Sequence, residues 1–450
     1  MMTRVPWVLV GLGCILARSG SPAPAVVTSA ATITLESVST SGAQGDLYSY
    51  AIDVSADGRY VLFNSDARNL VAHDTNDRTD AFVRDRVTGR TTRVSVSGDG
   101  AQAAPGRDPF GGSHAGGISG DGRYVVFRSD AANLVADDTN HAQDIFVRDR
   151  TTGRTRRVSV SSRGRQGNGA SSAPVISADG RYVAFVSAAS NLVASDTNDA
   201  ADVFVRDRVT GRTRRVSISS RGRQGKRESE EPTISRHGRF IAFSSPASTL
   251  VRGDTNRLAD VFVHDCRTGR TQRVSISSRG MQSAGSSTGT GSNGPAISGD
   301  GRYVAFHSDA SNLVPGDTNR AFDIFVRDRS TRKTRRISVG PAGAQANAES
   351  LGAPVISGNG RYVAFASLAT NLVAGDANDI TDVFERDRLA HRTILASIST
   401  TGREGTDSSW PAAFSGNGRY LTFSSWAGNL VPNDQSPGPD VFVRDFGRRS

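Results

Sequence analysis

The sequence predicts an all-β fold, a seven-bladed β-propeller of four-stranded antiparallel blades that the N-terminal strand closes. Three observations support this prediction. One unit recurs seven times, its apolar runs are short and bounded by Gly, Asp and Asn, and no long stretch shows the helical period of about 3.6 residues. The 48 glycines and the apolar fraction of 36% suit turn-rich β structure better than a helical bundle. Repeated four-strand units of this kind are typical of propellers.

Each copy of the unit begins with the pattern Ser-x-[Asp/Asn/His]-Gly-Arg-[Tyr/Phe]. The separation between this Ser and the Asp of the later VFVRD-like segment is the same in every copy. All length variation therefore falls between one copy and the next, as expected for exposed loops around a packed frame. The seven copies start at Ser55, Ser119, Ser177, Ser235, Ser298, Ser357 and Ser415.

Within one copy, residues 173–219, four strands are expected. They are residues 173–177, 181–187, 203–208 and 212–219, with an Ala-Asp-Gly turn after the first. The second and third strands carry apolar residues on both faces, so both faces must be covered. The fourth strand alternates apolar and polar residues, as a half-exposed outer strand does. An apolar Asn-Leu-Val segment in the long connection should pack beside the blade.

The two ends of the chain complement each other. The last copy stops just after Asp445 and has no fourth strand, whereas residues 36–45 align with residues 158–167, which hold a fourth strand and its following loop. We expect the N-terminal strand to complete the last blade and close the ring. Residues 26–450 are then a single domain.

Residues 1–25 have the features of a signal peptide. Arg4 precedes an apolar run over residues 7–17, and Ala23-Pro24-Ala25 is a small-x-small cleavage pattern. Cys14 would allow a lipid anchor, but the residues before it lack the expected Leu, so this interpretation is disfavoured. We expect a secreted, periplasmic or cell-envelope protein, monomeric and without a transmembrane segment in the mature chain.

The net charge of +10 is carried almost entirely by arginine. Arginines that recur at the same repeat positions favour a compositional cause such as a GC-rich genome. The functional alternative is attraction to an anionic surface such as an acidic polysaccharide. Nucleic acid is disfavoured as a partner, because no aromatic stacking platform accompanies the basic positions.

At the repeat motifs the sequence resembles the TolB-like, WD-like β-propeller repeat family. The likeness lies in ISADGRYVAF (residues 176–185), ISGDGRYVAF (297–306) and FVRDRVTGRTRRVS (204–217), and it covers roughly residues 33–446. The chain departs from the family in lacking Pro after the Ser and in carrying Arg236-His237 in the fourth copy. The resemblance implies an exported propeller scaffold that binds other molecules, and it implies no single activity.

An acidic loop precedes the third strand of every copy. Six loops have oxygen-bearing side chains at positions 1, 3 and 7, and Ca²⁺ takes about six to eight oxygen ligands. Calcium is therefore the one cofactor that the sequence suggests. The alternative is a structural turn, in which Asp and Asn bond the backbone or an Arg of a neighbouring strand. The candidate ligands are Asp74, Asn76, Asp80, Asp138, Asn140, Asp144, Asp196, Asn198, Asp202, Asp254, Asn256, Asp260, Asp317, Asn319, Asp323, Asp376, Asn378 and Asp382.

Two insertions, residues 98–117 and 277–294, should emerge on the same face as the acidic loops. Propellers usually bind ligands on such a face or at the mouth of the channel. Phe110, His114 and Trp410 are the candidate contact residues there. The expected partner is a protein or an anionic polysaccharide.

No catalytic residues are assigned from the sequence. The seven histidines form no close pair, which disfavours zinc. The carboxylates belong to the repeat frame, and no single copy stands out by an odd cluster of acids. A non-catalytic binding scaffold is therefore the preferred function. The alternative is a secreted glycan hydrolase or lyase that uses acids on the loop-rich face, for which Asp108, Glu404 and Asp407 would be the residues to test.

Overall fold

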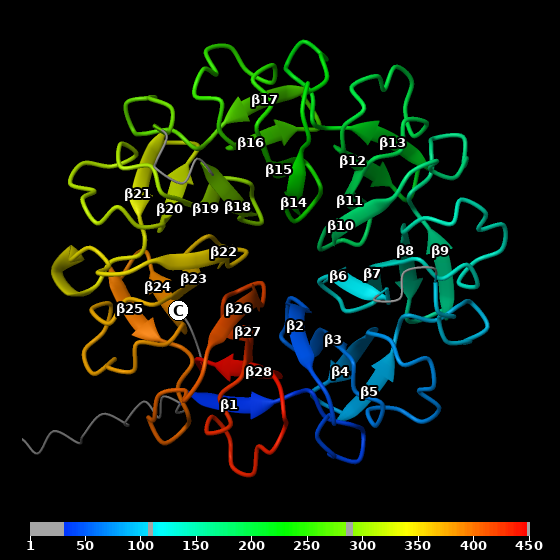
Figure 1. Cartoon of the computed structure of the whole chain (residues 1–450), viewed down its shortest axis with the longest axis horizontal. Coiled ribbons are helices and arrows are strands. Elements are labelled where there is room, and N and C mark those ends of the chain that lie inside the picture. The colour runs from blue at the N-terminus through cyan, green and yellow to red at the C-terminus, as the bar shows by residue number, and fades with distance from the viewer. Residues whose placement is uncertain (1–30, 107–110, 285–290, 448–450) are drawn as a thin grey trace, which may run out of the picture.

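The computed structural model describes residues 31–106, 111–284 and 291–447. Seven four-stranded antiparallel sheets stand in a ring around a central axis (Figure 1), so the predicted fold class is confirmed. The predicted signal peptide, Cys14, Asp108 and Phe110 lie outside the described residues. Within those residues, no helix is long and apolar enough to cross a membrane.

Six blades run from the axis outward in chain order, and blade seven does so for its first three strands. The innermost strands are β2 (Ser49–Val54), β6 (His114–Ile118), β10 (Ser171–Ile176), β14 (Glu230–Ile234), β18 (Ser292–Ile297), β22 (Ser350–Ile356) and β26 (Ser409–Phe414). The second strands are β3 (Tyr60–Ser65), β7 (Tyr124–Ser129), β11 (Tyr182–Ser187), β15 (Phe240–Ser245), β19 (Tyr303–Ser308), β23 (Tyr362–Ser367) and β27 (Tyr420–Ser425).

The third strands follow the acidic loops, and the fourth strands form the rim. The third strands are β4 (Asp80–Asp85), β8 (Asp144–Asp149), β12 (Asp202–Asp207), β16 (Asp260–Asp265), β20 (Asp323–Asp328), β24 (Asp382–Asp387) and β28 (Asp440–Asp445). The fourth strands are β5 (Arg90–Arg93), β9 (Arg154–Arg157), β13 (Arg212–Arg215), β17 (Arg270–Arg273), β21 (Lys333–Arg336), β25 (Arg392–Leu395) and, in blade seven, β1 (Thr32–Leu35). One short 3-10 turn, η1 (Pro341–Gly343), lies in a connection.

Blade seven combines both ends of the chain. Strand β1 pairs antiparallel with β28, with Thr32 opposite Asp445 and Leu35 opposite Phe442. The residues that follow, 36–45, form a connection closed by the bridge between Val38 and Gln44, as its counterparts in the other blades do. Strands β1 (blue) and β28 (red), which lie side by side in Figure 1, therefore belong to one sheet.

The rim strands are shorter than predicted. The expected strand over residues 212–219 ends at Arg215. The reason is the hydroxyl of Ser217, which donates to Asp202 and accepts from the backbone N–H of Val203 at 3.1 Å. These bonds turn the chain off the sheet and into the connection to the next blade.

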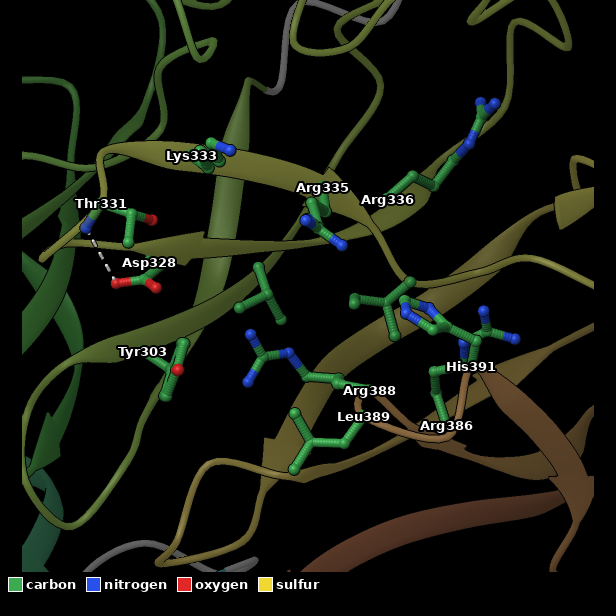
Figure 2. Close-up of a pocket in the computed structure, with 12 residues that line it drawn as sticks. Tyr303, Asp328, Thr331, Lys333, Arg335, Arg336, Arg386, Arg388, Leu389 and His391 are labelled. Atoms are coloured by element: carbon green, nitrogen blue, oxygen red, sulfur yellow. Dashed lines mark hydrogen bonds between the residues drawn. The ribbon is translucent and has the colours of Figure 1, made fainter.

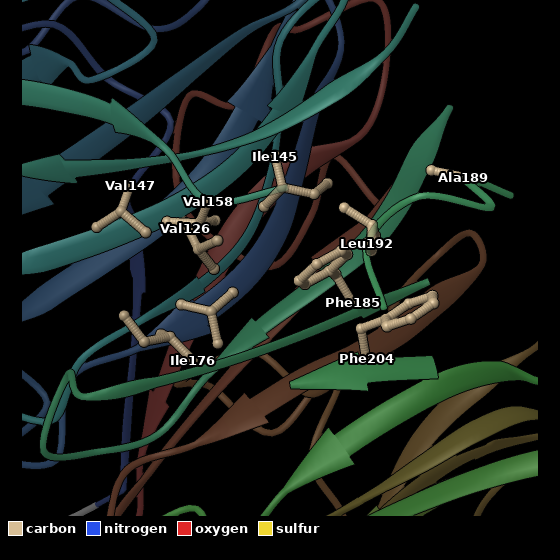
Figure 3. Close-up of a cluster of buried hydrophobic side chains, with 10 residues drawn as sticks. Val126, Ile145, Val147, Val158, Ile176, Phe185, Ala189, Leu192 and Phe204 are labelled. Carbon is tan, nitrogen blue, oxygen red and sulfur yellow. The ribbon is translucent and has the colours of Figure 1, made fainter. Parts of the chain in front are cut away.

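The core is a ring of phenylalanine pairs between second and third strands. In blade three, Phe185 stands opposite Phe204, and both side chains are fully buried with ring centroids 5.9 Å apart. All seven blades have such a pair. Figure 3 shows Ile176 and Leu192 packed with these rings against Val126 of blade two. Leu192 comes from the Asn-Leu-Val segment and is 2% exposed, so the predicted packing of this loop beside the blade is confirmed.

The recurring Arg-Asp-Arg run holds neighbouring elements together. Arg181 donates two hydrogen bonds to Asp207, at 3.0 and 2.7 Å, and these bonds hold the pKa of that carboxyl below its usual range. The guanidinium of Arg208 lies 4.0 Å from the ring centroid of Tyr124 in the preceding blade. Arg206 donates to backbone carbonyls of the connection that enters the blade. Much of the repeated positive charge therefore serves the fold.

Candidate functional site

The acidic loop of blade three has its own counter-charge. Nη1 of Arg215 lies 2.8 Å from Asp196 and 3.0 Å from Asp202, and both carboxylates are buried. Asn198 donates to Asp202 at 3.2 Å, and Ser217 donates to its other oxygen. Burial raises the pKa of Asp202, while the bond from Ser217 and the charge of Arg215 oppose that rise. The guanidinium thus lies between the two carboxylates.

Four further blades repeat this arrangement. In each, one guanidinium bridges the first and last Asp of the loop at 3.0 to 3.5 Å. The bridging residues are Arg93 for Asp74 and Asp80, Arg157 for Asp138 and Asp144, Arg273 for Asp254 and Asp260, and Arg336 for Asp317 and Asp323. Five of the seven loops are thus balanced internally, and calcium binding by them stays a prediction. Within residues 31–106, 111–284 and 291–447, no three His, Cys, Asp or Glu side chains already converge as a metal ligand set.

Blades six and seven depart from this pattern. In blade seven, Leu35 pairs with Phe442 at the register position of the bridging arginine, and Gln44 donates to both loop carboxylates. Blade six departs further. Leu395 pairs with Phe384, at the register position that Arg215 holds opposite Phe204. Glu404 stands where the other connections have Gln, beside Asp382. Blade six therefore carries a third acid near its loop, a cluster that the sequence analysis did not single out. The cluster escapes a motif search because Glu404 lies outside the acidic loop, more than twenty residues along the chain.

The predicted contact residues on the loop-rich face do not form one site. His114 begins β6 and is half-buried, and burial lowers its pKa. Trp410 lies on β26 of blade seven and is 38% exposed. A separate exposed aromatic pair, Tyr48 and Trp426, has centroids 5.4 Å apart. Phe110 is outside the described residues.

A basic pocket lies between blades five and six, with a volume of about 310 Å³ (Figure 2). Several of the arginines that line this pocket already interact with other groups of the protein. Arg388 donates to the carbonyl of Gly360 and stacks over Tyr303 at 4.0 Å, and Arg336 bridges its acidic loop. Burial lowers the pKa of Arg386. This pocket is a structural junction between blades.

Two larger grooves lie on the rim of the ring. The blade-three groove, about 700 Å³, lies between β13 and the connection over residues 161–165, and the blade-four groove, about 630 Å³, lies between β17 and residues 219–226. Hydrogen bonds fix each connection to its rim strand: Ser162 donates to the carbonyl of Thr213 at 3.2 Å, and Ser220 does the same for Thr271. Residues of the connection 218–224 line both grooves, so the two are adjacent.

Both grooves are strongly basic. Among the described residues, neither groove has an acidic residue in its lining. The cationic lining residues are Arg163, Arg165, Arg212, Arg214 and Arg215 in the first groove, and Arg221, Arg223, Lys226, Arg252 and Arg270 in the second. Of these ten, only Arg215 makes an ion pair with a carboxylate of the described chain. Most of the others are exposed.

The basic grooves depend on a feature that is not repeated around the ring. The connections SSRGRQG (residues 161–167 and 219–225) each carry two arginines, whereas SGDGAQA (97–103) and GPAGAQA (340–346) carry none. The signal was therefore present in the sequence, in the connections between copies, where all the length variation of the repeat also falls. Recognising these arginines as the lining of a groove requires knowing that the connections fold back onto the rim strand.

No family model and no curated protein matches the chain. Solved structures do. An oligogalacturonate lyase in complex with manganese is 12% identical, with 93% of this chain and 94% of that chain aligned at a TM-score of 0.53. An oligogalacturonate lyase from Vibrio parahaemolyticus is 11% identical, with coverages of 93% and 98% and a TM-score of 0.51.

TolB from Acinetobacter baumannii is 14% identical over 78% of this chain, at a TM-score of 0.40, and this chain spans 64% of that protein. Identities this low report the fold and leave function open. At the level of the fold, the chain is similar to solved β-propellers, as the alignments to the two oligogalacturonate lyases show.

Proposed function

We propose that this protein is an exported, non-catalytic β-propeller that binds an acidic polysaccharide through the two basic grooves on the rim of blades three and four. The observation that carries the proposal is the set of exposed cationic side chains in adjacent grooves whose linings hold no acid among the described residues. The predicted signal peptide supports export, because residues 1–25 have the charge and apolar pattern of a leader.

The chemistry of the lining favours a carboxylated polymer. A guanidinium presents a planar fork of N–H donors that matches a carboxylate, and it is more weakly hydrated than an ammonium group. Two connected grooves can contact successive acidic sugars of one chain. Protein interfaces, by contrast, are anchored by buried aromatic residues, and no aromatic side chain of residues 31–106, 111–284 and 291–447 lines either groove. The acidic polysaccharide is therefore preferred over a protein partner.

The proposal is tested by titrating the purified chain with polygalacturonate, with neutral dextran as the control polymer. The variant Arg163→Ala/Arg165→Ala/Arg221→Ala/Arg223→Ala removes four exposed cations from the grooves. At about 0.5 kcal/mol for each exposed contact, the loss is about 2 kcal/mol, or roughly thirtyfold weaker binding. Added salt should weaken wild-type binding as well.

The matched control removes the same charge elsewhere on the molecule. The variant Arg90→Ala/Arg154→Ala/Arg392→Ala/Arg403→Ala changes four exposed arginines outside both grooves. It should bind polygalacturonate within a few-fold of wild type. Equal losses in the two variants would mean that only net charge matters, and the proposed site would be wrong.

The same samples test the alternative of a glycan lyase or hydrolase. Two oligogalacturonate lyases share this fold, but a shared fold does not carry their lyase activity over to this protein. A lyase would release unsaturated sugars from polygalacturonate, which absorb in the ultraviolet, and a hydrolase would release reducing ends. We expect neither product. Release of either one, lost on Glu404→Gln, would replace the binding proposal with an enzyme.

A further inference from the structure

The acidic loop of blade six lacks the cation that balances five of its counterparts. In blade three, Arg215 bridges the two loop carboxylates at 2.8 and 3.0 Å. Blade six has Leu395 at that register position, and among the described residues its loop acids, Asp376 and Asp382, make no ion pair with a basic side chain. Both are nevertheless buried, with exposures of 9% and 1%.

The connection that follows blade six adds a third acid. The usual glutamine at this position reaches both loop carboxylates: in blade seven, the amide nitrogen of Gln44 lies 2.5 Å from Asp434 and 2.8 Å from Asp440. Glu404 replaces that amide with a carboxylate, so an oxygen takes the place of the donor. The loop is thereby left with three acids, no arginine and no glutamine.

One oxygen of Asp382 lacks a hydrogen bond of normal geometry, although the side chain of Asn378 lies near enough to lower the pKa of the carboxyl. Ser397 donates to Oδ1, whereas Oδ2 has no hydrogen bond within the described residues although the side chain is 1% exposed. A buried carboxylate oxygen without a hydrogen bond is costly, and buried charges are normally paired or bind metals. Burial, then the charges of Asp382 and Glu404, raise the pKa of Asp376 to about 6. The three carboxylates are therefore within electrostatic reach of one another.

We propose that Asp376, Asp382 and Glu404 form a binding site for one hard divalent cation of the calcium class, and that blade six is the only blade with such a site. The proposal does not rest on polysaccharide binding, since the two grooves are on blades three and four. In the five loops named above, the arginine already supplies the positive charge. Blade seven has Leu35 in place of that arginine, but Gln44 donates to both of its loop carboxylates, and no third acid replaces the amide.

The donor set selects the class of ion. Three carboxylates supply oxygen ligands and a charge of about −3, and hard cations with flexible geometry prefer such oxygens. Asp376 and Asp382 are held by the loop, while Glu404 lies on a connection and is only half-buried. Its side chain can rotate toward the two loop acids when the ion binds. Backbone carbonyls and water would complete the coordination shell.

The test is calorimetric titration of the chelator-treated full chain with CaCl₂. The wild type is compared with two variants, each of which restores a side chain that other blades have at the same repeat position. Glu404→Gln returns the usual glutamine, and Leu395→Arg returns the usual arginine. Both changes recreate an arrangement that other blades of this protein already have, so folding should be kept. The wild type should bind one ion per chain, and each variant should bind it about tenfold more weakly or not at all.

A control variant, Asp138→Asn, changes the equivalent acid of blade two, which Arg157 already balances at 3.1 Å. It should leave the stoichiometry and affinity unchanged. The thermal midpoint of the wild type should rise with CaCl₂, and that rise should be absent from both blade-six variants. Absence of binding to wild type, six ions per chain, or full binding by both Glu404→Gln and Leu395→Arg would each overturn the proposal.

Discussion

His264 provides a sharp test of how a break in the repeat affects stability. It occupies the position in β16 that arginine holds in the other six blades. The ring is 5% exposed, and Nδ1 lies 2.9 Å from the hydroxyl of Thr271. Burial lowers the pKa of His264 to about 4, with Asp265 opposing the shift and Arg214 adding to it.

The sign of the effect follows from the direction of this shift. An unfolded histidine has a pKa of about 6.5, so between about pH 6.5 and pH 4 the unfolded chain binds a proton that the folded chain does not. The contribution of neutral His264 to the free energy of unfolding is therefore fully present above pH 6.5, and it is lost as the pH falls toward 4. The shift corresponds to about 3 kcal/mol in total, and about 2.5 kcal/mol of it is lost by pH 4.5.

The assay compares urea unfolding of wild type and His264→Gln at pH 7.5 and pH 4.5. Glutamine can keep a hydrogen bond to Thr271 and does not titrate, so the variant should lose about 2.5 kcal/mol less than wild type on acidification. Taking the difference between the two proteins cancels the acids that titrate in both. Equal losses would show that His264 is not held neutral, and the reasoning from its burial would fail.

Two other substitutions test the packing and the loop network. Leu192→Ala should lower the free energy of unfolding by about 3 kcal/mol in urea titrations, because it removes a buried side chain from the junction of blades two and three; a loss below about 1 kcal/mol would mean that the loop does not pack there. Arg215→Leu should cost about 3 to 5 kcal/mol, because it leaves Asp196 and Asp202 buried without a counter-charge. Arg215→Lys should cost clearly less, and an equal cost for both variants would mean that charge is not what Arg215 contributes.

The repeat frame was predictable because its spacing is constant. The Ser that begins each unit and the Asp of the VFVRD-like segment keep one separation, and the structure explains it. Arg181, next to the turn after Ser177, is bonded to Asp207 at the end of the third strand, so a changed length would break the pair. The packing of Leu192 was predictable for a related reason, since an apolar residue at a fixed place in a polar loop needs a buried site.

The length of the rim strands was not predictable from alternation alone. Val216 and Ser217 continue the apolar–polar pattern of β13, yet the strand ends at Arg215 because Ser217 bonds Asp202. That bond joins a residue beyond the end of β13 to the first residue of β12, and it depends on the turn of the acidic loop. The local apolar–polar periodicity of the sequence does not predict such a contact. The same is true of the fold-back of residues 161–167 onto the rim, which creates the basic groove.

Breaks in the repeat are therefore more informative than the repeat itself, provided that they are compared in space. Leu395 alone reads as an ordinary apolar residue of an outer strand, and Glu404 alone reads as a surface acid. Leu395 replaces the arginine that five other blades have, and Glu404 replaces the glutamine that every other connection has. Together they change the local charge from about −1, with two Asp and one Arg, to about −3. Random substitution of surface residues gives no reason for both side chains that serve one loop to change toward more negative charge. Calcium titration of Glu404→Gln and Leu395→Arg therefore distinguishes a cation-binding loop from a purely structural turn.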